Sequence, residues 1–207
     1  RDRDVTGVQT CALPIYSRVD TCKPKYLDKL AKAGVKWLGL GIENPNNNLR
    51  KEIHKEGFQE VKVLDLINTI RDSGINVGGN YIFGLPYDTM ESMEATLEFA
   101  MENPTEMANF YSAMAYPGSP LHNQARMFNI ELPSTYAGYS QHSYETLNLS
   151  NKNLTSAQIL AFRDKAWDKY HSSPKYLQLM KDKFGQKAVD ELDSTKKVKL
   201  KRKILGD

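Results

Sequence analysis

The sequence predicts an α/β protein with a parallel sheet, followed by an all-helical C-terminal region. Up to Tyr116, helical patterns and short apolar stretches alternate three times with short connections. That order is typical of parallel strands joined by right-handed crossovers. From Tyr136 onward the alternation stops and only helical patterns follow. The sheet is therefore expected to be either open or part of a barrel.

Length and composition fit one or two domains without a membrane span. The chain has 207 residues, of which 40% are hydrophobic, and a net charge of +3. No apolar run is long enough to span a bilayer. Because the only cysteines are Cys11 and Cys22, the chain cannot build a disulfide framework or a multi-cysteine metal site. We expect a cytoplasmic protein with no metal ligands in this chain.

The first fifteen residues differ in pattern from the rest of the chain. Residues 1–15, RDRDVTGVQTCALPI, show neither helical nor strand periodicity. A common sequencing-library adapter, translated in frame, gives VTGVQTCALPI, which occupies residues 5–15. We interpret residues 1–15 as an adapter-derived artefact and exclude them from the fold prediction. The biological sequence is then expected to be a fragment that was cut at its N-terminal side.

The first helix and strand are predicted between residues 24 and 44. Pro24 is a favourable first helical residue, and Gly34 ends the helix. Residues 35–42, VKWLGLGI, indicate a strand whose glycines suit a crowded interior or the close approach of a ligand. Glu43 follows at the C-terminal end of this strand. In a fragment, we expect this strand to lie at an unpaired apolar edge.

The second helix and strand end in the stretch most typical of a ligand site. A helical stripe is formed by Val63, Leu66, Ile67 and Ile70. Residues 75–87, INVGGNYIFGLPY, then indicate a buried strand that ends in a Gly-Leu-Pro turn. Asn80 lies inside this apolar strand, and a buried amide needs hydrogen-bond partners. Ile82 is either a core residue or a ligand contact.

The third helix and strand lead to another turn. Asp88 and Glu91 resemble a capping box at the start of the helix. Residues 107–115 indicate a strand, and Tyr116 begins the turn YPGSP. Polar residues at the carboxyl ends of parallel strands are the usual ligand-binding positions in α/β proteins.

The C-terminal region is predicted to be helical throughout. Thr155 and Gln158 form a second capping box, and Pro174 opens a further helix. The inward side chains of that further helix are expected to be Leu177, Met180 and Phe184. Residues 186–205 are predicted to form a basic helix.

The motifs, taken in order, resemble the second half of the radical S-adenosylmethionine (radical SAM) core. They are GIEN at 41–44, NYIFGLP at 80–86 and AYPGSPL at 115–121. The tail, with YAGYSQHSYETLNL, ILAFRD and LKRKILGD, resembles the extension of the cobalamin-binding branch. That branch includes proteins similar to the anaerobic magnesium-protoporphyrin ester cyclase. On this basis residues 16–121 are the core half and residues 122–207 a helical extension.

The resemblance implies the second half of a partial (β/α)6 TIM-like barrel. It further implies a parent enzyme that holds a [4Fe–4S] cluster on a CxxxCxxC loop and also binds cobalamin. An electron donor reduces the cluster, and S-adenosylmethionine (SAM) is cleaved to a 5′-deoxyadenosyl radical that acts on a small-molecule substrate. No CxxxCxxC occurs in this sequence, so the fragment is expected to be inactive alone. Methyl transfer, cyclisation and other rearrangements stay open, and no catalytic residue is assigned.

The resemblance also implies a set of SAM contacts. Glu43 would contact the ribose or the methionyl amine, because a carboxylate accepts hydrogen bonds from either group. Asn80 would face the ribose and Ile82 the adenine. Backbone groups of Ala115 and Tyr116 would bind the adenine edge. The alternative for Glu43 is a solvated strand-end carboxylate.

Two other functions remain open from the residues. One is a TIM-like α/β enzyme of another kind, although Gly39-Leu40-Gly41 lacks the third glycine of a dinucleotide fingerprint. The other is a non-catalytic interaction module whose basic C-terminal helix binds an acidic partner or RNA. Nucleic acid is not an expected partner, because the run 196–203 is typical of a solvated helix face.

Overall fold

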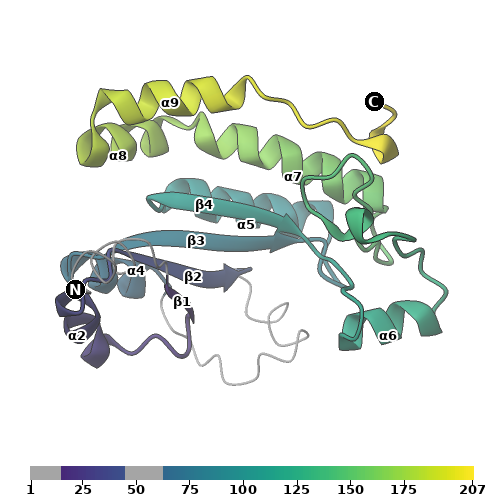
Figure 1. Cartoon of the computed structure of the whole chain (residues 1–207), viewed down its shortest axis with the longest axis horizontal. Helices are drawn as coiled ribbons and strands as arrows, with labels where there is room; N and C mark the ends of the chain where they lie inside the picture. The colour runs from purple at the N-terminus through teal and green to yellow at the C-terminus, as the bar shows by residue number, and fades with distance from the viewer. Residues whose placement is uncertain (1–14, 45–62) are drawn as a thin grey trace, which may run out of the picture. The chain divides into compact units, whose positions relative to one another are not determined.

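The computed structural model describes residues 15–44 and 63–207. The strands in these ranges form one sheet, in the order in which they occur along the chain (Figure 1). They are β1 (Ile15–Arg18), β2 (Trp37–Glu43), β3 (Asn76–Phe83) and β4 (Met107–Ser112). Strand β2 pairs in parallel with β1 and with β3. The expectation that residues 35–42 lie at an unpaired edge is therefore wrong, because β1 covers that side.

Helices precede β2, β3 and β4, as the alternating pattern predicts. They are η1 (Pro24–Tyr26), α2 (Leu27–Lys32), α4 (Val63–Asp72) and α5 (Met90–Glu102). The remaining helices follow β4 and are α6 (Pro120–Met127), η2 (Tyr136–Tyr139), α7 (Ser156–His171), α8 (Pro174–Phe184), α9 (Gln186–Lys196) and η3 (Lys203–Leu205). Within the described ranges, no helix has the length and apolar character needed to cross a bilayer.

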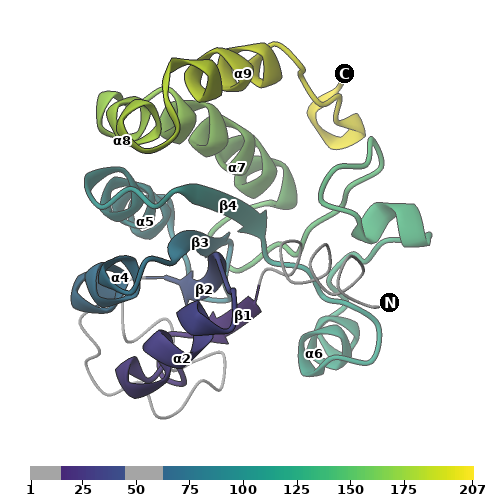
Figure 2. The ribbon, with the colours of Figure 1, turned by 60° about the vertical axis from the view of Figure 1, so that its left-hand side comes forward.

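The chain divides into two compact units. The first comprises residues 1–81 and 102–109, and the second comprises residues 82–101 and 110–207. Strands β3 and β4 each begin in the first unit and end in the second. In the second unit, α8 lies beside α7 and α9 (Figure 2).

The first unit has a core of aliphatic side chains. The predicted stripe of α4 is confirmed, because its four members are buried, and so are the alternate residues Leu38, Leu40 and Ile42 of β2. Arg71 of α4 donates from Nε to Glu106 Oε1 over 2.8 Å. Glu106 Oε2 accepts from Val77 N over 2.9 Å, which connects the start of β3 to the residue before β4.

The second unit has an aromatic core. Phe83 of β3 stacks on Phe110 of β4, with 5.6 Å between ring centroids, and meets Phe162 of α7 edge-on at 5.0 Å. Phe110 also meets Tyr170 edge-on at 5.3 Å. The capping box that the sequence predicts at Thr155 is confirmed at the start of α7.

Three local predictions in this unit are wrong. The first turn of α5 is capped by Thr89, whose Oγ1 accepts from Ser92 N over 3.2 Å, and not by Asp88. On α8 the buried side chain is Tyr176 and not Leu177, Met180 or Phe184. The predicted basic helix ends at Lys196. Beyond it the chain is extended, so that Arg202 leaves the solvent and is 1% exposed.

Candidate functional site

On one face of the sheet in the first unit, side chains of nearby residues lie directly over the glycines: a β-carbon at Gly39 would lie 2.5 Å from Tyr16 Cδ1, and one at Gly78 would lie 3.0 Å from Met107 Cε. Gly39 of β2 lies beside Gly78 of β3, and Gly41 lies beside Asn80. Leu38 and Leu40, which alternate with the glycines, point to the opposite face and are buried. The glycines therefore let these neighbouring side chains, among them the Tyr16 ring, approach the backbone closely.

Glu43 lies at the carboxyl end of β2 in an uncommon backbone conformation. Its φ is 63°, in the left-handed region that residues with a β-carbon seldom occupy. The register between β2 and β3 shifts at this point, between Gly41 and Glu43. The side chain folds back along the strand, since a β-carbon at Gly41 would lie 2.8 Å from Glu43 Oε1. The glycine at 41 thus provides the space that the carboxylate occupies.

Asn80 connects three strands through its side-chain amide. Its Nδ2 donates to Leu40 O over 3.3 Å and to Gly78 O over 3.1 Å. Its Oδ1 accepts from Asn109 Nδ2 of β4 over 3.0 Å. Both amide hydrogens are thereby used within the protein, and Oδ1 keeps one further acceptor position. Asn80 is 8% exposed, so a ligand that reaches it meets a rigidly oriented oxygen.

Asn109 is a further candidate residue that the sequence does not single out. It fixes the orientation of Asn80, and it is only partly buried. The same signal that drew attention to Asn80, an amide within an apolar strand, is present in MANFYS at β4. A group bound near Asn80 would also meet Asn109.

The Gly-Leu-Pro turn that follows β3 is held by buried polar groups. Gly84 has a φ of 77°, and a β-carbon there would lie 2.6 Å from Ile159 Cγ2 of α7. Asp88 Oδ2 accepts from Leu85 N over 2.9 Å, and Asn151 Nδ2 donates to Leu85 O over 2.8 Å. Burial raises the pKa of the Asp88 carboxyl, against the hydrogen bonds from Ser92 and the turn backbone.

Ile82 and the residues after β4 belong to the second unit. Ile82 is partly buried and lies two residues beyond Asn80 on β3, hence on the same face of that strand. Ala115 is 2% exposed, and among the described residues no hydrogen bond engages its backbone N–H or C=O. Tyr116 is 50% exposed, and its ring stacks on that of Tyr139 with 6.1 Å between centroids. Buried backbone groups normally have partners, so Ala115 offers a donor and an acceptor to a ligand.

The described residues do not fit an iron–sulfur cluster. Within them, no three His, Cys, Asp or Glu side chains come together in a way that could hold a metal ion. Cys22 is a buried free thiol, and burial raises its pKa, which opposes the thiolate form that a cluster requires. Cys11 lies outside the described residues.

The residues fit a nucleoside better than a metal. A carboxylate on a strand end and an oriented amide oxygen are present in the first unit. A buried backbone edge without a partner in the described chain is present in the second. Carboxylates and amides suit ribose hydroxyls or an ammonium group, and a backbone edge suits the hydrogen-bonding edge of adenine.

Part of the chain is similar to known proteins. Residues 5–100 match the family model of the radical SAM superfamily. An uncharacterized methyltransferase of Pyrococcus horikoshii is 30% identical over 163 residues, which are 78% of this chain and 34% of that protein. The bacteriochlorophyllide d C-12(1)-methyltransferase of Chlorobaculum tepidum is 25% identical over 118 residues, which are 55% of this chain and 26% of that protein. The chain thus spans about a third or less of the length of these relatives.

Among solved structures, the archaeal Elp3 of Methanocaldococcus infernus has the same fold. It aligns with a TM-score of 0.52 and 21% identity over 60% of this chain and 31% of that chain. The predicted fold class is confirmed: a parallel α/β sheet that forms the second half of a partial TIM-like barrel, followed by helices.

Proposed function

We propose that this chain, whose residues 5–100 match the radical SAM family model, binds the ribose and adenine of SAM within a methyl-transferring enzyme. The two relatives described above are both named as methyltransferases. This favours methyl transfer over cyclisation among the reactions that the sequence leaves open. The substrate would be a small molecule, and the enzyme would work in the reducing cytoplasm with an electron donor.

The observation that carries this proposal is the conformation of Glu43. A left-handed residue with a β-carbon is strained by about 1–2 kcal/mol, and here it brings a carboxylate over Gly41 at the end of β2. Strain of this kind is typical of binding sites. Glu43 accepts hydrogen bonds from ribose hydroxyls or the methionyl ammonium, while Asn80 Oδ1 accepts one from the ribose.

The adenine would be bound by residues of the second unit. Ile82 offers an apolar contact for the ring, and the backbone of Ala115 offers one donor and one acceptor to its edge. Tyr116, whose ring is already stacked on Tyr139, limits the space beside the base. These roles need only groups that the chain itself supplies.

The cofactors of the parent enzyme are a separate part of the proposal. A [4Fe–4S] cluster supplies the electron that cleaves SAM in such enzymes, and its thiolate ligands are not among the described residues. Cobalamin as methyl carrier is supported by the resemblance of the tail motifs alone. We therefore assign to this chain the binding and orientation of SAM, and we expect no turnover from it alone.

The test is binding of S-adenosylhomocysteine to the purified chain, measured by equilibrium dialysis with the tritiated compound. Glu43→Gln removes the charge at constant size. Since a hydrogen bond to a charged group is worth about 1.5–3 kcal/mol, this change weakens binding about 10- to 100-fold. The control is Glu102→Gln, at the exposed C-terminal end of α5, which leaves the affinity unchanged.

Two outcomes contradict the proposal. Either the wild-type chain shows no saturable binding, or Glu43→Gln binds as tightly as wild type while the control also does. Circular dichroism of each variant separates a lost contact from a lost fold, because a lost contact leaves the spectrum unchanged.

The alternative of a basic interaction helix has lost its structural basis. Residues 197–202 are not helical. Two of the basic side chains beyond α9 are paired within the chain, Lys199 with Asp168 at 2.6 Å and Arg202 with Asp164 at 2.8 Å. An acidic partner would have to compete with these internal carboxylates.

A further inference from the structure

The C-terminal region makes hydrogen bonds to the backbone of β4, which is the last strand of the described sheet. Arg163 Nε donates to Phe110 O over 2.7 Å. The side-chain amide of Gln141 bonds to both backbone groups of Ser112, accepting from N over 3.1 Å and donating to O over 2.9 Å. Gln141 therefore imitates a neighbouring strand, and it satisfies an edge that would otherwise be open to other chains.

The same region holds the chain just beyond β4. Ala113 N donates to Phe83 O of β3 over 2.7 Å, and Ala113 O accepts from Leu149 N over 2.9 Å. Ala115 and Tyr116, the proposed adenine contacts, follow two and three residues later. The position of this backbone is thus set by residues 141–149 as well as by the sheet.

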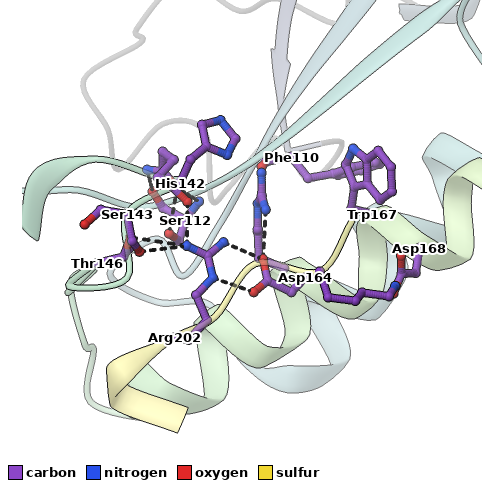
Figure 3. A network of polar contacts seen from close by, with 12 residues as sticks. Phe110, Ser112, His142, Ser143, Thr146, Asp164, Trp167, Asp168 and Arg202 are labelled. Carbon is purple, nitrogen blue, oxygen red and sulfur yellow. Dashed lines mark hydrogen bonds and ion pairs between the residues drawn. The ribbon is translucent and has the colours of Figure 1, made fainter. Parts of the chain in front are cut away.

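The backbone at Gln141 is in turn fixed by Arg202, whose guanidinium Figure 3 shows between Asp164 and Thr146. The guanidinium Nη1 donates to Gln141 O over 2.9 Å, to Ser143 O over 3.2 Å and to Thr146 Oγ1 over 3.3 Å. On its other side, Nε and Nη2 donate to the two oxygens of Asp164 over 2.8 and 2.9 Å. A two-fold contact between arginine and a carboxylate fixes both distance and orientation.

Asp164 is shared between two arginines. Arg163 Nη1 donates to Asp164 Oδ1 over 2.8 Å, beside the two bonds from Arg202. Burial alone would raise the pKa of Asp164, but hydrogen bonds and charge from Arg202 and Arg163 outweigh it and lower the pKa. The carboxylate stays ionised at neutral pH, so it links Arg163, which contacts Phe110 of β4, to Arg202, which contacts the backbone at Gln141.

We propose that Arg202 is a positioning residue for the proposed SAM site. By holding the backbone at Gln141, it directs the Gln141 amide onto Ser112 and so fixes the strand end that leads to Ala115 and Tyr116. This inference rests on the proposed function, because it adds a cause for the adenine contacts that the chain would make.

Three variants of the full chain test it by S-adenosylhomocysteine dialysis. Arg202→Met removes all the guanidinium bonds, Gln141→Leu removes only the bonds to Ser112, and the third variant combines both. Each single change is expected to raise the dissociation constant about tenfold, and the double change no further, because both act through one contact. The matched control, Lys199→Met, removes an exposed ion pair from the same segment and leaves binding unchanged.

Hydrogen–deuterium exchange provides a readout that does not depend on ligand binding. Arg202→Met is expected to speed the exchange of the amides at 140–147 and at 112–116, while Gln141→Leu speeds only the latter. Arg202→Lys keeps the charge but lacks the planar set of N–H donors of the guanidinium. We expect it to restore less than half of the exchange protection that is lost in Arg202→Met.

The outcomes separate the two proposals. If wild type does not bind the analogue, the proposed function fails, and faster exchange at 112–116 in Arg202→Met still supports the positioning role. If exchange rises only at 140–147 and 197–207, or if the two single changes add in the double variant, Arg202 does not act through Gln141 and the inference is overturned.

Discussion

The two ends of β4 are held by arginine–carboxylate contacts of different design. At the amino end, Glu106 accepts from Arg71 Nε over 2.8 Å and from Val77 N over 2.9 Å. At the carboxyl end, Asp164 is bound by two arginines, and Arg202 reaches back to Gln141, 61 positions earlier in the sequence. The first contact joins residues of the alternating part of the chain that are 35 positions apart, whereas the second joins the C-terminal region to the strand.

The two contacts are expected to serve different purposes. The contact at the amino end of β4 stabilises the fold, and the contact at the carboxyl end supports ligand binding. In barrels with parallel strands, groups at the amino ends of strands serve stability, while ligands bind at the carboxyl ends. The Arg71–Glu106 pair lies at the start of β3 and β4 and contacts none of the residues proposed to bind SAM. The Asp164 cluster instead supports the backbone just before Ala115 and Tyr116. Changes at the two ends should therefore affect different measurements.

The largest effect on stability is expected from Arg71→Met. The Glu106 side chain is fully buried, and Arg71→Met removes its ion pair with Arg71, which we expect to cost about 3–5 kcal/mol of the free energy of unfolding. Urea unfolding followed by circular dichroism measures this loss. Arg126→Met on the exposed face of α6 is the control. Below the unfolding transition, binding of S-adenosylhomocysteine should be unaffected. Weakened binding in the folded variant would contradict the proposed difference between the two ends of β4.

A somewhat smaller loss of stability is expected when the pH is lowered, and the residue responsible is His171 of α7. The ring packs on Tyr170, which in turn meets Phe110 of β4. Burial lowers the pKa of His171 to about 4, although its hydrogen bond with Trp167 O and the charge of Asp168 favour protonation; Lys196 and Arg163 oppose it further. In the folded protein the imidazole is therefore neutral at pH values where the unfolded chain binds a proton.

The sign of this effect follows from linkage. Because the folded pKa is below the unfolded one, the contribution is complete above pH 6.5 and is lost as the pH falls towards 4. The loss amounts to at most about 3 kcal/mol. Urea unfolding of His171→Phe and His171→Gln between pH 7 and 4.5 should show a flatter dependence than wild type. An equal dependence of the unfolding free energy on pH in all three proteins would contradict this prediction.

The smallest effect is expected from Gly84→Ala, in the turn after β3. An alanine there adopts a left-handed conformation and also presses on Ile159, so we expect a loss of about 2–3 kcal/mol. Gly118→Ala is the matched control, with a φ of 84° and nothing within 4 Å of the added carbon. It should cost about 1 kcal/mol, and the difference in unfolding free energy measures the packing of α7 on the turn. Equal losses would show that Ile159 yields without cost.

Patterns local to one element were predictable from the sequence. The stripe of α4, the strand before the Gly-Leu-Pro turn and the capping box at Thr155 each follow from residues within about one or two turns of each other. The cap of α5 was assigned to Asp88 because a carboxylate three residues before a glutamate fits the box pattern. In the structure the buried Asp88 binds the preceding turn, and Thr89 caps the helix.

Contacts between distant residues were not predictable. Arg202 lies in a run of lysines that reads as a solvated helix face, and only its pairing with Asp164 explains why it is buried. The bond between Asn109 and Asn80 likewise depends on the alignment of β3 and β4. Of the proposed SAM contacts, the sequence indicated where Glu43 and Asn80 lie, but not that Asn80 is held by three strands.

The strained backbone at Glu43 has a consequence for protein engineering. Glycine or asparagine adopts a φ of 63° more readily than glutamate, so a library screened for melting temperature alone would enrich these two residues at position 43. Such thermostable clones would keep the fold and lose the carboxylate proposed to bind SAM. A selection on this scaffold should therefore score ligand affinity and melting temperature together, since at this position the two criteria choose different amino acids.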